Sequence, residues 1–357
     1  MHIGFVAGLN DRKLSQKLAP LQAMPEVTRI SLFRRQPFFG EKVQWHPLPA
    51  FVDLHPLLGD LWRMMQLLYR GSECDLLVGC HQRFHGLMVA LAGKILKVPT
   101  AQLIITDFDL MWGHPAFRWA IRQAVVVGLR GQKAKKSCLS KLSPELPLLF
   151  IPPNVLPPPL PKSEPTATKR DIDVLFVGSF TEDKNIPLLA KILEGIKDSR
   201  SRLEAYVIGE GPELKRFQTH IKKEGLSKEV TILEMLPYAD LEGFYRRAKL
   251  LLLPSRAEGF PMVIPEAMGW GTPVVASDVG GIGDLVISDK TGFLVASGNC
   301  EGFIAACEKI LEDQELADQL AVNARIAHDD FVAASSLEAG IEQWRKALSV
   351  VAPKKRK

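Results

Sequence analysis

Short apolar segments alternate with segments of helical periodicity along most of this chain, and this alternation restricts its fold more than any other feature. In the first part we expect strands at 2–7, 27–33, 75–80 and 100–105, and helices at 11–23, 56–70, 84–97 and 116–127. In the second part we expect strands at 172–178, 203–208, 229–233, 249–253 and 272–276, and helices at 185–197, 212–224, 239–248, 261–270, 300–312 and 314–328. Such apolar strands are typical of parallel sheets covered by helices on both faces. The predicted fold class is α/β, with doubly wound parallel sheets.

A proline-rich run, IPPNVLPPPLPKSEPTATKR at 151–170, separates the two parts. Proline fixes φ and has no N–H to donate, so this run predicts an extended linker. We therefore expect one domain over 1–150 and a second over 171–335, facing each other across a cleft. Residues 336–357 would form a helix that crosses back over the cleft and a basic tail. In sheets of this kind, ligands bind beyond the carboxyl ends of the strands.

Charge is distributed unevenly between the two parts. Residues 1–165 carry a net charge of +9 and residues 166–357 one of −4, within a total of +5. A basic first half suggests an anionic partner: a phosphorylated substrate, an anionic membrane surface or nucleic acid. A chance distribution of charged residues is the alternative explanation for this difference. No RNA- or DNA-binding motif is present, so we expect no nucleic-acid partner.

Cysteine usage and hydropathy further narrow the class of protein. Five scattered cysteines without a CxxC pair predict reduced thiols and no metal site. No apolar run approaches the ~20 residues of a membrane-spanning helix, and the start, MHIGFVAGLN, lacks a signal-peptide pattern. We therefore expect a cytoplasmic protein, and leave open peripheral contact with the inner face of the plasma membrane.

Two glycine turns follow expected strands in the second part. In FVGSFTEDKN, Lys184 stands where a helix begins, and a helix start with a lysine suits a phosphate group. Gly178 and Ser179 form the turn before it. In VIGEGPEL, Gly209 would let the backbone approach a ligand closely. A surface lysine and a plain tight turn explain these two features equally well.

The stretch SRAEGFPMVIPEAMGWGTPVVASDVGG at 255–281 is more specific. Glu258 follows an apolar strand, a Gly-Phe-Pro turn leads into a short helix, and Glu266 lies one turn further on. Carboxylates placed in this way suit sugar or ribose recognition, because each accepts hydrogen bonds from hydroxyl groups. The glycines at 280–281 would offer backbone N–H groups to a phosphate.

Together these motifs resemble the signature of family 4 retaining glycosyltransferases, part of glycosyl transferases group 1. The resemblance is carried by E-G-F-P, a second Glu eight positions after the first, G-x-P-V-V-A-S-D-x-G-G, IPPNV (151–155), VGSF-x3-KN (177–185) and TGFLV (291–295). It covers about residues 151–330 and extends loosely to 74–100. It implies a GT-B architecture of two Rossmann-like domains, the first on the acceptor side and the second binding a nucleotide-sugar.

The resemblance also implies a role for individual residues. Lys184 would neutralise the donor diphosphate, Glu258 would contact hydroxyl groups of the donor sugar, and Glu266 would bind the nucleotide ribose. The donor would be a UDP- or GDP-sugar, with no separate cofactor and no metal. The implied donor-binding residues are Gly178, Ser179, Lys184, Gly209, Glu258, Gly259, Phe260, Pro261, Glu266, Gly280 and Gly281. Lys184 and N–H donors near Phe260 would stabilise negative charge on the leaving diphosphate.

The sequence departs from the family pattern in two places. Ser179 stands where the family usually has an arginine, and Thr106-Asp107 stand where it often has His-Asp. His81 and Asp107 are the candidate catalytic residues facing the acceptor, beside Glu258 and Lys184 in the second domain. A structural histidine explains His81 equally well. The missing cations leave open a slow enzyme, a different donor or a partner that supplies a group.

Residues 114–136 predict a surface for an anionic membrane or a phosphorylated lipid carrier. HPAFRWAIRQAVVVGLRGQKAKK has six Lys or Arg residues, no acid, two aromatic residues and an apolar centre. In the helix expected at 56–70, we place Trp62, Met64 and Met65 in the core.

The function predicted first is a metal-independent retaining glycosyltransferase. It would move a hexose from a nucleotide-sugar to a polysaccharide or lipid-linked acceptor in cell-surface glycan synthesis. The alternative is a non-catalytic sugar-nucleotide-binding or scaffold protein of the same fold, favoured by Ser179 and Thr106. A UDP-sugar epimerase would need additional acids and a histidine that the sequence does not identify.

Overall fold

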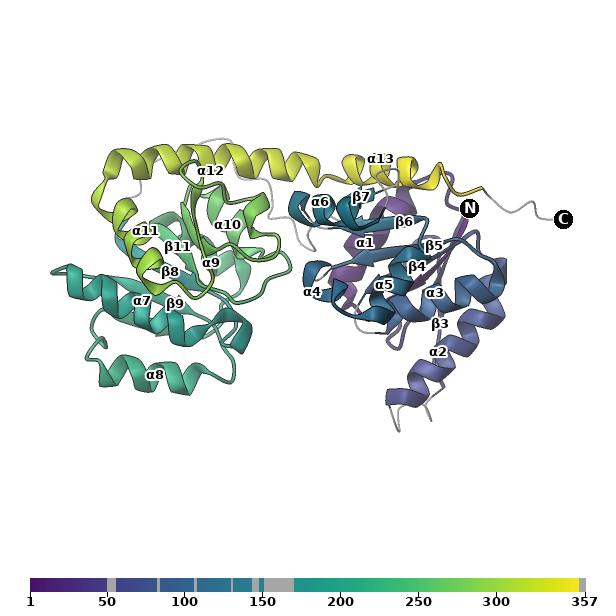
Figure 1. Ribbon diagram of the computed structural model, residues 1–357, viewed down its shortest axis with the longest axis horizontal. Coiled ribbons are helices and arrows are strands. Elements are labelled where there is room, and N and C mark those ends of the chain that lie inside the picture. The colour runs from purple at the N-terminus through teal and green to yellow at the C-terminus, as the bar shows by residue number, and fades with distance from the viewer. Residues whose placement is uncertain are drawn as a thin grey trace. The chain divides into compact units, whose positions relative to one another are not determined.

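The computed structural model describes residues 1–49, 56–81, 84–105, 108–129, 131–142, 148–150 and 170–352. Contacts divide the chain into two compact units: unit 1 contains residues 1–156 and 334–357, and unit 2 contains residues 157–333. Each unit is built on a parallel β-sheet with helices on both faces, as the alternating pattern predicts (Figure 1). The expected linker at 151–170 lies almost entirely outside the described residues and stays a prediction.

Unit 1 has a seven-stranded sheet in the order β3-β2-β1-β4-β5-β6-β7. Its strands are β1 (His2–Val6), β2 (Arg29–Phe33), β3 (Val43–His46), β4 (Leu76–His81), β5 (Thr100–Ile104), β6 (Val126–Leu129) and β7 (Leu148–Phe150). Its helices are α1 (Asp11–Ala23), α2 (Pro56–Arg70), η2 (Gly71–Glu73), α3 (His85–Leu96), α4 (Phe108–Trp112), α5 (Pro115–Arg122), α6 (Gln132–Lys141) and α13 (Leu337–Leu348).

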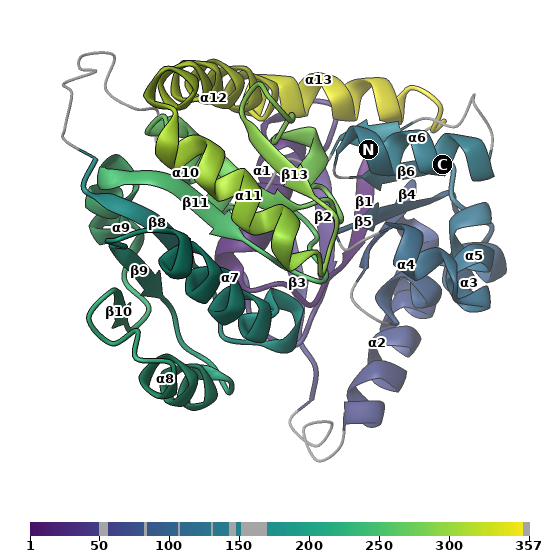
Figure 2. The ribbon, with the colours of Figure 1, turned by 60° about the vertical axis from the view of Figure 1, so that its left-hand side comes forward.

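Side-chain alternation along the strands gives this sheet two separate cores. In β1, Ile3 and Phe5 pack with α1 and α13 on one face, whereas Val6 packs with α2 and α3 on the other. A third cluster joins β5 and β6 to α4, α5 and α6. Helices α2, α3 and α5 therefore belong to the same layer of unit 1 and lie side by side in both views (Figures 1 and 2).

The expected helix at 116–127 is wrong in its second half. Helix α5 ends at Arg122, and the chain continues as the buried strand β6 between β5 and β7. The sequence AVVVGL explains this, because β-branched residues favour a strand. The apolar centre of 114–136 therefore lies in the core and cannot face a membrane, which corrects the expectation for that stretch as a whole.

Unit 2 has a six-stranded sheet in the order β10-β9-β8-β11-β12-β13. Its strands are β8 (Ile172–Val177), β9 (Ala205–Ile208), β10 (Val230–Leu233), β11 (Ala248–Leu253), β12 (Val274–Ser277) and β13 (Gly292–Val295). Its helices are η3 (Glu182–Lys184), α7 (Ile186–Ser199), α8 (Leu214–Lys223), α9 (Tyr238–Arg247), α10 (Val263–Gly269), η4 (Ile282–Asp284), α11 (Cys300–Glu312) and α12 (Gln314–Ala334). Helices α7 and α11 pack together on one face, and α9 and α10 lie on the other (Figure 2).

The last helix, α13, belongs to unit 1 although unit 2 precedes it in the chain. Ser336 caps its first turn by accepting a hydrogen bond from the N–H of Ala339. Trp344 is buried in the same core cluster as Leu14 and Leu18 of α1. Gly340 permits this packing, since a Cβ there would lie 2.9 Å from the Pro20 ring. No helix in the described residues is long and apolar enough to cross a membrane.

Candidate functional site

The carboxyl ends of β8 and β11 lie side by side at the centre of the unit 2 sheet. The strand order β10-β9-β8-β11-β12-β13 reverses its direction of growth between these two strands. Loops that leave such a switch point diverge to opposite faces of the sheet, and ligands of doubly wound folds bind between them. Lys184 comes from the loop after β8, and Glu258 comes from the loop after β11.

Lys184 and Glu258 form an ion pair within this site. The Lys184 ammonium donates to Glu258 Oε1 at 2.5 Å, and the Ser255 hydroxyl donates to the same oxygen at 2.7 Å. The side chains of Lys184 and Glu258 are only 17% and 10% exposed. Among the described residues Glu258 Oε2 has no hydrogen-bond partner. The pair is thus held in place while one carboxylate oxygen stays available to a ligand.

The two loops are also joined through their backbones. The Arg256 N–H donates to the Asp183 carbonyl at 2.7 Å, which fixes the turn that carries Glu258 next to the turn that carries Lys184. Asn185 takes a left-handed conformation, with φ of 54°, between η3 and the start of α7. Asn185 is both the C-cap of η3 and the N-cap of α7, so Lys184 ends one helix just before the next begins. Lys184 therefore lies near a helix start, as the sequence indicates.

The glycines of the site bring backbones together. A Cβ at Gly280, which has φ of +54°, would lie 1.7 Å from the Glu258 carbonyl oxygen. A Cβ at Gly209 would lie 1.8 Å from the Gly178 carbonyl oxygen. The Gly281 N–H donates to the Gly259 carbonyl at 3.1 Å, so it is not free to bind a phosphate as the sequence suggested. These positions need glycine for close backbone approach, whichever ligand binds.

Backbone N–H donors in the turn at 259–261, and at Gly280 beside it, have no backbone acceptor among the described residues. These donors are the N–H groups of Gly259, Phe260 and Gly280. The Phe260 ring itself is buried and stacks on Phe331 of α12 at 5.4 Å between ring centres. Pro261 is buried beside it. The backbone of this turn can therefore serve an anion while its side chains anchor the loop.

Glu266 lies in the first turn of α10, because the helix begins at Val263 and not at the expected Pro261. Tyr245 of α9 is fully buried, and its hydroxyl donates to Glu266 Oε2 at 2.9 Å. Burial, followed by the charge of Glu266, raises the pKa of Tyr245 far above its usual value. Tyr245 therefore stays protonated and holds the Glu266 carboxylate in one orientation.

Sequence reasoning missed Ser255 and Tyr245. Ser255 follows β11 within KLLLLPS and was a detectable candidate, because polar residues just beyond a buried strand often line a site. Tyr245 had no such signal, since it lies on an ordinary helix 21 residues before its partner. Ser179 is partly exposed in the turn after β8, where its hydroxyl lies 3.4 Å from that of Thr181.

The candidates in unit 1 are less well defined. His81 ends β4 and pairs with Ile104 of β5, so its backbone lies at the carboxyl edge of the sheet, as expected. Thr106 and Asp107 lie outside the described residues. Among the described residues no three His, Cys, Asp or Glu side chains are grouped so that they could hold a metal ion.

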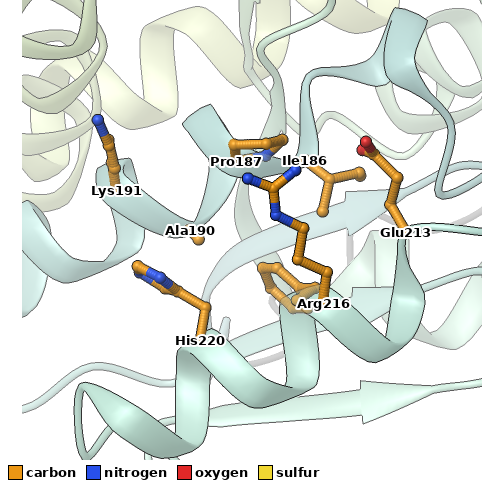
Figure 3. Close-up of a pocket in the computed structure, with 8 residues that line it drawn as sticks. Ile186, Pro187, Ala190, Lys191, Glu213, Arg216 and His220 are labelled. Carbon is orange, nitrogen blue, oxygen red and sulfur yellow. The ribbon is translucent and has the colours of Figure 1, made fainter.

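A separate pocket of about 180 Å³ lies between α7 and α8 and contains none of the predicted site residues. Figure 3 shows Arg216 of α8 and its N-cap residue Glu213 extending toward the start of α7, with His220 of α8 and Lys191 of α7 on the other side of the pocket. Its floor is apolar and is formed by Ile186, Pro187, Ala190 and Phe217. The pocket begins two residues after Lys184, but it is distinct from the Lys184–Glu258 site.

Comparisons with known proteins show which family and which folds this chain resembles. Residues 161–327 match the model of the family glycosyl transferases group 1. An uncharacterised glycosyltransferase of Methanocaldococcus jannaschii is 31% identical over 151 residues, 42% of this chain and 41% of the relative. A D-inositol 3-phosphate glycosyltransferase of Gordonia bronchialis is 30% identical over 184 residues, 49% of this chain and 40% of the relative. The chain thus aligns with less than half the length of these two relatives.

Two solved structures share the whole fold at low identity. Anabaena HepE in complex with UDP has a TM-score of 0.72 at 22% identity and covers 98% of this chain and 100% of its own. Sucrose-phosphate synthase from Thermosynechococcus elongatus has a TM-score of 0.72 at 18% identity, with 99% and 100% covered. The expected fold class, two Rossmann-like GT-B domains, is confirmed. Residues 161–327 are thus similar to the glycosyl transferases group 1 family.

Proposed function

We propose that this chain is a retaining, metal-independent hexosyltransferase. It moves a hexose from a UDP- or GDP-sugar to a polysaccharide or lipid-linked acceptor in cell-surface glycan synthesis, on the cytoplasmic side. The observation that carries the proposal is the meeting of Lys184 and Glu258 at the switch point of unit 2, beside N–H groups without backbone acceptors. Solved neighbours of the same fold hold UDP or UDP-glucose, which supports a nucleotide-sugar as the donor.

The chemistry requires charge stabilisation on the leaving group. When the bond from the sugar C1 to the diphosphate oxygen breaks, the electron pair stays with the nucleoside diphosphate. Lys184 and the N–H groups of Gly259, Phe260 and Gly280 would stabilise that charge, because preorganised donors need no rearrangement during the step. The acceptor oxygen then bonds to C1 on the face that the diphosphate left, and its proton passes to solvent or to the diphosphate.

The ion pair has a consequence for donor binding. A diphosphate that binds Lys184 competes with Glu258 for the ammonium group. The Ser255 hydroxyl would keep hold of Glu258 when Lys184 turns to the phosphate. Glu258 Oε2 would then accept hydrogen bonds from the sugar hydroxyls, and Glu266 would accept those of the ribose. On the acceptor side, His81 and Asp107 remain the candidate catalytic residues.

A panel of UDP-, GDP- and ADP-sugars, read first by thermal shift and then by product mass, tests the proposal. Lys184→Ala and Glu258→Ala should each lower transfer by about 100-fold or more, since one stabilising donor is worth roughly that much. Lys191→Ala is the matched control, because it removes an exposed lysine from the same helix region without touching the pair. Unchanged turnover in both site variants would contradict the assignment.

The non-catalytic alternative rests on a specific observation. Lys184 is already neutralised by Glu258, and Ser179 adds no second positive charge at the turn after β8. A protein that only binds a sugar nucleotide would show heat on titration with UDP or GDP and no transfer or hydrolysis with any donor. Product formation with one donor of the panel excludes it.

A further inference from the structure

Exposed hydrophobic side chains of unit 1 concentrate on two neighbouring helices, α2 and α3. Among the described residues, those with large exposed apolar side chains here are Leu57, Leu58, Leu61, Met65, Tyr69, Phe84, Leu91 and Ile95. Soluble proteins rarely expose contiguous apolar surface of this kind unless it contacts a partner. In unit 2 the comparable side chains, such as Val322, Ile287 and Met235, are spread over separate elements.

On α2 the exposed side chains recur every four residues. Leu57, Leu61, Met65 and Tyr69 form one stripe, opposite the fully buried Leu67. Met65 is 60% exposed, so the expectation that it packs in the core is wrong, whereas Met64 does pack against the core. The stripe is thus the outer side of an amphipathic helix whose inner side packs against the core of unit 1.

Helix α3 continues this surface and adds positive charge. Leu91 and Ile95 of α3 and its N-cap residue Phe84 are exposed, and α3 packs against both α2 and α5. Lys94 of α3 lies over the Trp119 ring of α5 at 5.7 Å, and Arg122 of α5 lies over the Trp112 ring at 5.8 Å. Both cations are exposed to solvent. Aromatic rings paired with Lys and Arg are typical of the membrane–water interface.

The surface contains almost no negative charge. Helices α3 and α5 have no Asp or Glu, and the one acid of α2, Asp60, is paired with Arg63 at 3.0 Å. A second copy of this chain is a poor occupant, because a symmetric contact would bring Lys94 and Arg122 toward their own copies with no acid nearby. An anionic lipid surface matches both the apolar stripe and the charge.

We propose that the outer side of α2, α3 and α5 is a docking face for an anionic lipid bilayer. Leu57, Leu61, Met65 and Ile95 enter the headgroup boundary, and Lys94 and Arg122 contact the lipid phosphates. The face differs from the predicted 114–136 surface, of which only the helix part, α5, takes part. It is independent of the transfer reaction proposed above.

Vesicle co-sedimentation of the full chain tests this face. Phosphatidylcholine vesicles are compared with vesicles in which phosphatidylglycerol replaces about a third of the lipid. The wild type should bind the anionic vesicles, and the pair Leu61→Glu with Met65→Glu should lower binding about tenfold or more. The pair Lys94→Glu with Arg122→Glu should lower it by a similar factor and remove the preference for anionic lipid.

Matched controls come from unit 2. Val322 and Ile326 on α12 are 60% and 57% exposed, so Val322→Glu with Ile326→Glu adds the same charge to an equally exposed helix. Arg202→Glu with Lys223→Glu reverses the same charge at exposed positions. Both controls should bind vesicles as the wild type does, and circular dichroism and UDP-induced thermal shift should be unchanged in every variant.

Three results would overturn the docking face. They are equal binding of the α2 variant and the wild type, equal loss in the α12 control, and a dimer by light scattering that the α2 variant converts to a monomer. Failure of the donor panel with intact vesicle binding would refute the proposed transfer reaction and leave the docking face standing.

Discussion

The two units of this chain share one architecture and use it differently. In unit 2 the distinctive groups stand on loops beyond the strands, where Lys184, Glu258 and Ser255 are held in a defined network. In unit 1 the corresponding feature is the set of exposed apolar side chains on α2 and α3, with the cations Lys94 and Arg122 beside them. The difference teaches that a parallel sheet covered by helices offers two independent places for recognition, the strand ends and the helix layer.

The units also differ in how their backbones approach each other. In unit 2, Gly209 and Gly280 would each place a Cβ within 2 Å of a carbonyl oxygen of another turn. In unit 1, Gly4 and Gly71 face the ends of side chains, such as Leu77 and Leu96. Side-chain ends can rotate away, whereas a backbone carbonyl can move only if its chain segment shifts with it. We therefore expect Gly209 and Gly280 to tolerate substitution less than Gly4 and Gly71.

The largest effect should come from Gly280→Ala. Its Cβ would collide with the Glu258 carbonyl, and alanine is strained at its φ of +54°. We expect a loss of about 2–4 kcal/mol of unfolding free energy, confined to unit 2, and loss of donor binding. Gly225→Ala is the control, since Gly225 also has a positive φ, of +70°, but nothing lies within 4 Å of its Cβ. Hydrogen exchange by mass spectrometry locates the loss, and equal losses in both variants would refute the packing argument.

Much of the fold was predictable from hydrophobic patterning. The bounds of α1, α2 and α11 are as predicted from periodicity, because each has one apolar and one polar face. The pattern missed the short strands β3, β7 and β13, although it found β9, β10 and β12, which are also four residues long. It also failed at 116–127, where a helix and a strand join without a glycine or proline between them.

The site was predictable only in part. The motif at 255–281 identified Glu258 and Glu266, since two acids beyond a buried strand are unusual. The ion pair with Lys184 was not predictable, because 74 residues separate the partners and strand order alone brings them together. The function of Gly281 was misjudged for the same reason: its N–H is used by Gly259, which lies 22 residues earlier.

After Gly280→Ala, the second-largest effect should be a pH dependence of the stability of unit 1. Burial, and then the charge of Arg70, lowers the pKa of His46 to about 4. When the pH falls below about 6.5, the usual pKa of a histidine, the unfolded chain binds a proton at His46. The folded chain binds this proton only near pH 4, so protonation favours the unfolded state. The stability of unit 1 should therefore fall as the pH drops from about 6.5 to 4, by about 2–3 kcal/mol in total.

His46→Phe tests this dependence, because phenylalanine can keep the stack on the Phe33 ring, whose centre is 5.0 Å away. Urea unfolding at several pH values should show a smaller slope between pH 6.5 and 4 in the variant than in the wild type. An unchanged slope would mean that His46 has the same pKa in the folded and unfolded chain. The pH dependence of stability would then not distinguish unit 1 from unit 2.

A smaller effect should follow from Tyr245→Phe, which removes the hydrogen bond to Glu266 and keeps the ring buried. The KM for the nucleotide-sugar should rise about fivefold to tenfold with kcat nearly unchanged, because a typical hydrogen bond contributes about 0.5–1.5 kcal/mol net. Tyr206→Phe on β9 is the control. If Glu266→Gln raises the KM and Tyr245→Phe does not, then Tyr245 does not orient the carboxylate.

The smallest effect compares one helical glycine in each unit. Gly243 in α9 has open space around its Cβ, so Gly243→Ala should stabilise unit 2 by about 0.5–1 kcal/mol through helix propensity alone. Gly93 in α3 would place a Cβ 2.2 Å from Thr100 of β5, so Gly93→Ala should destabilise unit 1. Thermal unfolding of both variants measures the two signs. Equal signs would mean that α3 moves away from its sheet, and the docking face of unit 1 would then rest on a mobile helix.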